Sequence, residues 1–361
     1  MQRYFPLLSA TIFLLALSFG AQATTWTVSN NPNKPAQFTS AQAAADSAAA
    51  GDTLLISGST TSYGNLSIVK QLHLIGEGWG SSVDVPTFGT IYCSNQDATV
   101  NASGSVIEGL NISGLHLGYY GSGNLENVVV KRCNVTYPYY DYNYSNAAIS
   151  NIRIEDSRIR NYAGFNPSYW SGNGGNVEGI EFLRCVFDGL TSYHLSGVGD
   201  CNGHLIIRNC MFLTTGGKVH NGDMSEATFE NCIFIGGNFT GVANCVFNHC
   251  LAYQGDDALP PTGNAGSGNL SSTDPQFASY PSTPTDFSWD HDYTLAAGSP
   301  AIDAGAQGAG MDLGIGGNLT SFDGNLPETP RGPVVTEVNL PVTAVAVGGT
   351  LQINVSAESR D

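Results

Sequence analysis

A repeated pattern of small and apolar residues runs through the middle of the chain and constrains its fold more than any other feature. Each copy is marked by one small residue, and the six markers are Cys133, Ser157, Cys185, Cys210, Cys232 and Cys245. Their spacing is nearly regular, except that Cys245 follows Cys232 more closely than the others follow one another. The regular spacing falls within the range that corresponds to one supersecondary unit per copy. We therefore expect similar units stacked on one another.

Apolar residues flank each marker at fixed offsets. Every copy is apolar three positions before the marker and two positions after it: Val130, Ile154, Phe182, Ile207, Phe229 and Val242 come before it, and Val135, Ile159, Phe187, Phe212, Phe234 and Phe247 come after it. This period of two on both sides of a short break predicts a strand, a tight corner and a second strand. Asn209, Asn231 and Asn244 directly precede three markers, and Asn tolerates the left-handed backbone of a sharp corner. Similar triplets extend the repeat back to about residue 65.

Stacked units of this kind predict an all-β fold, a parallel β-helix of about eight or nine coils with strands about 4.8 Å apart. A helical repeat is disfavoured because these segments are short, β-branched or aromatic, and interrupted by some of the 44 glycines. Neighbours in a parallel ladder point the same way, so we expect the marker cysteines to be buried free thiols. Phe187, Phe212, Phe234 and Phe247 should stack beside them. The pattern leaves the state of Cys93, Cys201 and Cys250 open.

The N-terminal segment 1–23 is typical of a cleaved signal peptide. It contains Arg3, an apolar run from Phe5 to Phe19, and the small-residue pattern Ala21-Gln22-Ala23. The mature chain would start at Thr24. The run is shorter than a membrane span, so we expect a secreted or cell-surface protein and not an integral membrane protein.

The rest of the chain divides into two predicted regions. Residues 24–320 form the β-helix domain, in which residues 38–50 are rich in Ala and form a short helix that Gly51 ends. Residues 321–361 form a linker and a C-terminal β-hairpin, whose apolar runs Val338–Val347 and Leu351–Val355 flank Gly348-Gly349.

At this point the sequence resembles the right-handed parallel β-helix proteins of the pectate-lyase-like superfamily, which have the pectin lyase fold. Besides the repeats, the segments Phe38–Gly78, Gly268–Phe277 and Tyr293–Gly305 carry the likeness. It implies that the N-terminal helix caps the coil and that the SPAIDAG segment closes it. These motifs are specific for the fold and nearly silent on the reaction. The resemblance raises a polysaccharide lyase or glycoside hydrolase as an alternative function.

The net charge of the chain limits the kinds of molecule that it can bind. Lys and Arg number 13 against 30 Asp and Glu, which gives a formal net charge of −17. Such a surface repels phosphate backbones, so we expect no nucleic-acid partner.

Two corner aspartates, Asp200 and Asp223, should lie about one coil apart, with Lys218 and His220 close by. Asp200, Asp223 and Lys218 are the candidate catalytic residues, and Asp200 and Asp223 are also the candidate calcium ligands. The favoured interpretation is that these aspartates bond backbone amides in turns and that no cofactor is required.

Aromatic residues gather in successive long corners. Because corners stack, we predict one exposed carbohydrate-binding patch of Tyr139, Tyr140, Tyr142, Tyr169, Trp170 and Tyr193. The alternative is that these loops pack into a cluster on the coil. The preferred function is thus a monomeric protein that binds a polysaccharide or other glycan, and the third class considered is a structural or adhesive surface protein.

Overall fold

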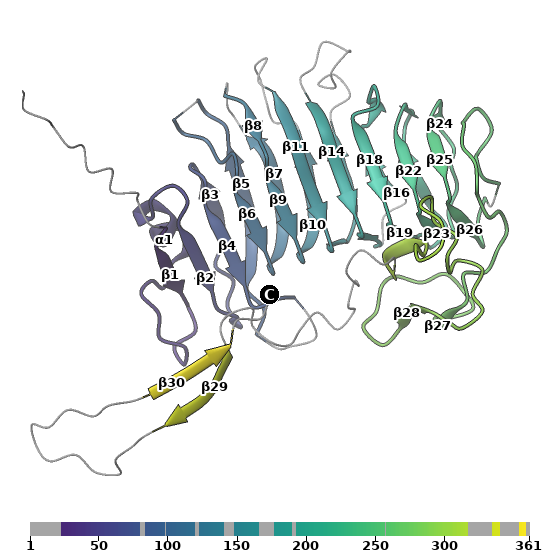
Figure 1. Cartoon of the computed structure of the whole chain (residues 1–361). Coiled ribbons are helices and arrows are strands. Elements are labelled where there is room, and N and C mark those ends of the chain that lie inside the picture. Colours follow the sequence, from purple (N-terminus) through teal and green to yellow (C-terminus); the bar gives the residue numbers. More distant parts are fainter. Residues whose placement is uncertain are drawn as a thin grey trace, which may run out of the picture.

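The computed structural model describes residues 23–79, 84–97, 99–119, 123–140, 148–165, 177–189, 193–256, 258–316, 334–339 and 354–358. Within these residues the chain forms a parallel β-helix of about eight coils, whose strands stack along one axis from α1 to β26 (Figure 1). The predicted fold class is confirmed. No helix of this part of the chain is long and apolar enough to cross a membrane.

One face of the coil is an 11-stranded parallel sheet. Its strands, in spatial order, are β1 (Thr25–Val28), β2 (Thr53–Ile56), β4 (His73–Gly76), β6 (Val106–Glu108), β9 (Val129–Lys131), β11 (Ile149–Glu155), β14 (Val177–Leu183), β18 (Leu205–Arg208), β22 (Thr228–Glu230) and β25 (Val246–Asn248), with β8 (Leu125–Glu126) beside β11. A smaller sheet contains β17 (Gly199–Asp200), β21 (Met224–Ser225) and β24 (Val242–Ala243).

The second large sheet has 12 strands and forks at β10 (Asn134–Tyr140). Before the fork lie β3 (Leu66–Ile68), β5 (Thr87–Ser94) and β7 (Asn111–Tyr119). The start of β10 pairs with a row that we call the covered half: β12 (Arg158–Ile159), β15 (Val186–Phe187), β19 (Met211–Leu213), β23 (Ile233–Ile235) and β26 (Leu251–Tyr253). The end of β10 pairs with β13 (Ala163–Phe165), which is followed by β16 (Tyr193–Ser196) and β20 (Lys218–Asn221). These three strands, with β5, β7 and the end of β10, are called the open half.

Corners in the left-handed backbone region precede the marker positions, as the asparagines predicted. Asn209, Asn231 and Asn244 have φ of 50°, 57° and 54°. The amide of Asn231 donates to the side-chain oxygen of Asn209 at 3.5 Å, so these two also bond along the axis.

The eight cysteines are free and buried, which confirms the thiol prediction for the marker residues and extends it to the three left open. Burial raises the pKa of the Cys93 and Cys133 thiols to about 12. Several thiols donate a hydrogen bond to a backbone carbonyl of the preceding coil. The Cys232 thiol, for example, donates to the carbonyl of Ile207 at 3.4 Å. These thiols act as small core side chains.

The predicted register is wrong in the last copy. Ile233 pairs with Leu251 and Phe229 with Phe247, so Cys250, and not Cys245, follows Cys232 in the marker column. The Phe187, Phe212 and Phe234 rings stack at 4.5 and 4.9 Å, whereas the Phe247 ring stacks on Phe229 at 4.7 Å. The coil from Cys232 to Cys250 is shorter than the coils before it. The spacing of the earlier markers therefore does not predict which cysteine follows Cys232.

A short helix, α1 (Ala41–Ser47), covers the first coil with the buried Ala41, Ala44 and Ala45. It begins after Ser40, whose hydroxyl accepts the amide hydrogen of Ala43. It ends at Ser47 and not at Gly51 as predicted. The residues after Ser47 are not helical, and the Ala49 amide instead donates a hydrogen bond to the Asp52 carboxylate at 2.8 Å.

After β26 the chain first continues the stack, because Ala265 bridges Val246 and Leu270 bridges Leu251 in parallel register. Residues 277–316, which we call the cover, then pack on the outside of the covered half and contain the antiparallel pair β27 (Phe277–Ser279) and β28 (Asp292–Leu295) and the 3-10 turn η2 (Gly314–Gly316). At the C-terminus, β29 (Val334–Asn339) and β30 (Asn354–Glu358) pair antiparallel, as the predicted hairpin requires, but the first strand starts earlier than its apolar run.

Candidate carbohydrate-binding site

A row of half-buried aromatic side chains crosses the outer surface of the open half. We call it the aromatic strip, and it consists of Tyr92, His116, Tyr137, Tyr139, Tyr162 and Tyr193. The strip residues of β5, β7 and β10 alternate with buried ones such as Ile91 and Leu115, so their side chains point away from the core. The parallel register then aligns them across the coils.

The first part of the strip is a stack. Tyr92, His116 and Tyr139 occupy one register position, and their ring centroids are 5.3 and 5.0 Å apart with interplanar angles of 29° and 28°. Because neighbouring rings cover each other's faces, the stack presents ring edges and polar tips to the surface. The row runs along the axis of the coil.

The second part of the strip is a set of tilted rings. Tyr162 lies edge-on to Tyr137 at 5.3 Å and tilted against Tyr193 at 5.2 Å, and its hydroxyl lies 3.3 Å from the hydroxyl of Tyr139. Gly164 makes this approach possible, because a Cβ there would lie 2.6 Å from the Tyr139 ring. The two phenol groups therefore form a fixed hydroxyl pair.

The strip is uncharged near neutral pH. Desolvation lowers the pKa of His116 below its usual value, which keeps the imidazole neutral. The neighbouring cation is Lys218, which pairs with Tyr193 in the strand register.

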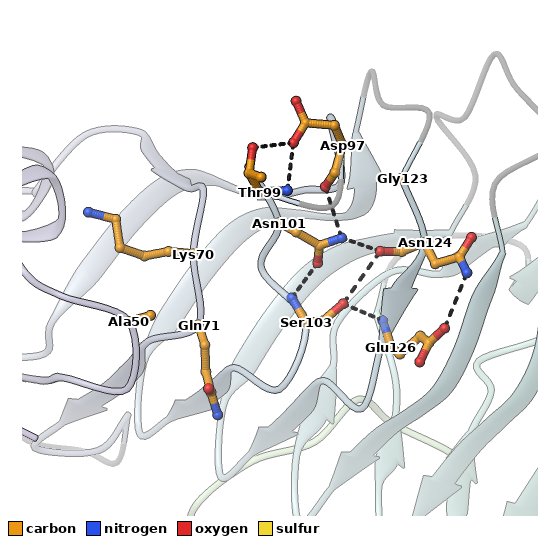
Figure 2. Close-up of a pocket in the computed structure, with 10 residues that line it drawn as sticks. All are labelled: Ala50, Lys70, Gln71, Asp97, Thr99, Asn101, Ser103, Gly123, Asn124 and Glu126. Atoms are coloured by element: carbon orange, nitrogen blue, oxygen red, sulfur yellow. Dashed lines mark hydrogen bonds between the residues drawn. The ribbon is translucent and has the colours of Figure 1, made fainter. Parts of the chain in front are cut away.

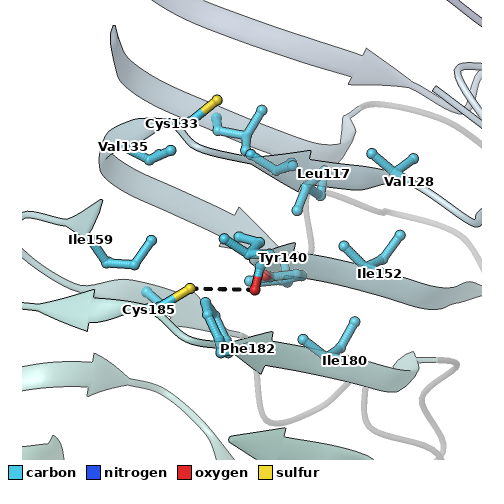
Figure 3. Close-up of a cluster of buried hydrophobic side chains, with 14 of the residues drawn as sticks. Leu117, Val128, Cys133, Val135, Tyr140, Ile152, Ile159, Ile180, Phe182 and Cys185 are labelled. Atoms are coloured by element: carbon cyan, nitrogen blue, oxygen red, sulfur yellow. Dashed lines mark hydrogen bonds between the residues drawn. The ribbon is translucent and has the colours of Figure 1, made fainter. Parts of the chain in front are cut away.

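The structure divides the predicted tyrosine patch. Tyr139 and Tyr193 lie in the strip, while Tyr142, Tyr169 and Trp170 lie outside the described residues. The prediction that Tyr140 is exposed is wrong: it is 1% exposed and stacks on Phe165 at 4.7 Å. Figure 3 shows its hydroxyl directed toward the sulfur of Cys185 inside the coil. Tyr140 faces inward because it occupies the register position of Leu117.

The two candidate aspartates do share a site. Asp200 and Asp223 line a hollow of about 460 Å³ over β17, β21 and β24, beside Gly, Ser and apolar residues. Asp200 accepts the Asn202 amide at 3.1 Å, which is the turn bond that the favoured interpretation expected.

Neither predicted basic partner lines this hollow, although His220 lies close enough to Asp223 for that carboxylate to raise its pKa in part. Lys218 is on β20 of the 12-stranded sheet, and His220 is fully buried, where desolvation lowers its pKa to about 4. Within the described residues, no three His, Cys, Asp or Glu side chains gather as a metal site.

A larger hollow of about 740 Å³ lies near the N-terminal end of the coil, and Figure 2 shows its polar lining. Its polar side chains mostly bond backbone groups of the same corners. Asp97 accepts the amides of Thr99 and Val100, and Asn101 accepts the Ser103 amide at 2.7 Å. These bonds explain the cluster as two linked corner turns.

No protein-family model matches the sequence, and no curated protein matches it. Among solved structures, the crystal structure of pectate lyase Pel9A is similar with a TM-score of 0.49 and 11% identity over 81% of this chain and 96% of that one. ORF18 of Geobacillus virus E2 is similar with a TM-score of 0.32 and 13% identity over 63% of this chain and 55% of that one. Neither likeness is strong enough to carry an argument about function.

Proposed function

We propose that this chain is a secreted or cell-surface protein that binds polysaccharide through the aromatic strip. The observation that carries the proposal is the continuous row of half-exposed, polar-tipped aromatic side chains across successive coils. Aromatic rings with polar tips offer apolar contact and hydrogen bonds to a sugar together. The signal-peptide pattern at the N-terminus supports export.

The geometry favours a ligand that is long and uncharged. A chain of sugars lying along the coil axis would meet one ring edge or hydroxyl per coil. The hydroxyls of Tyr139 and Tyr162, only 3.3 Å apart, suit a pair of sugar hydroxyls. With His116 neutral, the strip residues themselves carry no charge, so a carboxylate on the ligand would be balanced only at the end of the strip, where Lys218 pairs with Tyr193 in the strand register.

A glycan array, with a parallel assay for new reducing ends, tests this proposal. We expect binding to a polysaccharide without new reducing ends. The double variant Tyr162→Ala, Tyr193→Ala should weaken binding at least tenfold, because each ring contact contributes about 1 to 3 kcal/mol by analogy with base stacking. Ile302→Ala, a change at an exposed apolar residue on the C-terminal segment, is the control. Equal affinity of the double variant and this control would contradict the proposal.

A further inference from the structure

One buried carboxylate ties together the first elements of the coil. Asp52 lies directly before β2 and is 3% exposed. It accepts three N–H groups: the Thr24 nitrogen at 2.7 Å, the Trp26 indole at 2.9 Å and the Ala49 amide at 2.8 Å. These bonds hold the pKa of Asp52 below its usual value, and the bond from Thr24 has the largest effect.

Among the described residues, the charge of Asp52 has no close cation. A carboxylate that leaves water is costly unless a cation or several hydrogen bonds compensate it. No lysine or arginine of the described chain forms an ion pair with Asp52. The ammonium of Lys70 acts on it only at a distance, since it bonds the carbonyls of Ala48 and Asp46 at 2.8 and 3.2 Å.

The nitrogen closest to Asp52 is the one that signal-peptide removal would free. Thr24 follows the Ala21-Gln22-Ala23 pattern, and residues 23 to 25 are exposed. We propose that Ala23–Thr24 is the processing site and that Asp52 is a built binding site for the new N-terminal ammonium. This inference does not depend on what the aromatic strip binds.

The chemistry is the hydrolysis of one peptide bond by a signal peptidase. Water supplies the hydroxyl that goes to the carbonyl carbon of Ala23 and a proton that goes to the Thr24 nitrogen. A second proton from solvent makes that nitrogen an ammonium at neutral pH. A neutral amide donor thus becomes a charged one at the same place, and charge-assisted hydrogen bonds are roughly twice as strong as neutral ones.

Processing would therefore strengthen the N-terminal cap. The Asp52 carboxylate joins β1 to the residues after α1, and β1 pairs with β2 in register from Thr25 to Val28. The uncleaved chain makes the same contact with a weaker donor, so it can fold but holds its first strand less firmly.

The pH dependence follows from the amine. A free α-amino group has an ordinary pKa of about 7.7 to 8.0, and pairing with Asp52 raises it in the folded state. The added stability is complete below that range and is lost as pH rises through the raised pKa. The other ionisable groups on the elements around this site are Asp46, Asp52, Lys70 and His73, and they are common to chains with a free or a blocked terminus. The difference between two such chains isolates the amine.

The test compares a chain released from a fusion so that Thr24 is its free terminus with the same chain carrying an acetyl group on Thr24. We expect the free chain to melt about 2 to 4 °C higher near pH 6.5 and the difference to vanish near pH 10. In Asp52→Asn the two forms should melt together. Equal melting of the two unsubstituted forms near pH 6.5 would overturn the inference, as would a difference that persists in Asp52→Asn. If Asp52→Asn does not fold, the pH comparison decides alone.

The processing site has its own measurement. Intact-mass analysis of the chain exported by cells should show Thr24 as the first residue. Any other first residue would overturn the assignment of the site.

Discussion

The two halves of the 12-stranded sheet enclose one interior, but their outer surfaces differ in chemical character. In the covered half the outward residues are mostly apolar, with Arg158 as the charged exception, and Val186, Met211, Leu213, Ile233 and Ile235 are buried beneath residues 277–316. In the open half the outward residues are the polar-tipped rings of the aromatic strip. Bare apolar side chains need a cover, whereas tyrosines can keep their hydroxyls in water. The difference shows which surface of the coil is covered, and our proposal assigns ligand binding to the other surface.

A buried ion pair fastens the cover to the coil. Arg158 donates two hydrogen bonds to Asp188, at 2.9 and 2.6 Å, and Asp188 also accepts the Phe287 amide at 2.9 Å. The Arg158 guanidinium lies 4.9 Å from the centre of the Phe287 ring. Burial raises the pKa of Asp188 even though Arg158 opposes the shift, so the pair carries a desolvation cost.

Breaking that pair should have the largest effect. Asp188→Ala leaves the Arg158 charge buried without its partner and frees the Phe287 amide, so it should lower the free energy of unfolding by about 3 to 5 kcal/mol. Denaturant unfolding measures it. Asp290→Ala, at an exposed carboxylate of the same segment, should cost almost nothing. A loss as small for Asp188→Ala as for this control would show that the cover is not fastened here.

The shared interior gives the next prediction. Phe212 stacks between Phe187 and Phe234 and is fully buried, so Phe212→Ala should cost about 3 to 5 kcal/mol by opening a cavity. Phe212→Leu keeps most of the volume and should cost clearly less. Glycan affinity of the folded fraction should not change in either variant. A selective loss of affinity would mean that the interior and the strip are coupled.

Much of this fold is visible in the sequence because a parallel coil repeats its inward positions. The left-handed corners and the buried marker cysteines follow from residue types at fixed offsets, and the N-terminal helix follows from an Ala-rich segment. The register of the last coil does not follow from such offsets, because the length of this coil differs from that of the earlier coils. Lengths of corners depend on tertiary packing and leave no periodic signal.

The strip was found only in part for a related reason. Inward positions in the forked region step by three and then by two, as Ile112, Leu115 and Leu117 do, and Val135, Pro138 and Tyr140 repeat that step in the next coil. Simple alternation from Val135 therefore misplaces Tyr140. Aligning these triplets would have identified Tyr92 and His116, which stand isolated in the sequence and join Tyr139 only through the register.

A smaller effect should distinguish hydroxyls from rings within the strip. Tyr162→Phe keeps the ring and removes one member of the hydroxyl pair with Tyr139. Glycan affinity should fall by about 0.5 to 1.5 kcal/mol, with the melting temperature unchanged. Isothermal titration calorimetry on this variant and on Tyr63→Phe, a half-buried tyrosine outside the strip, provides the comparison. Unchanged affinity would assign the contact to ring edges alone.

The smallest effect is expected at the corner aspartates. Removal of calcium should shift the melting temperature by less than a few degrees, because Asp200 caps a turn and, among the described residues, no third His, Cys, Asp or Glu joins Asp200 and Asp223 as a metal ligand. A large stabilisation by calcium that disappears in Asp200→Asn, Asp223→Asn would establish a metal site at this hollow.

The most direct test pairs Tyr162 of the open half with Tyr293 of the segment that packs on the covered half, and measures melting temperature and glycan affinity on the same proteins. Tyr162→Ala should weaken glycan binding roughly tenfold and leave the melting temperature nearly unchanged. Tyr293→Ala, on β28 of the covering segment where the ring is buried against the covered half and stacks on Phe287 at 5.3 Å, should lower the melting temperature by roughly 6 °C or more and leave the affinity of the folded protein intact. The opposite pattern, with stability lost at Tyr162 and no affinity to lose, would contradict the division between a binding half and a stabilising half.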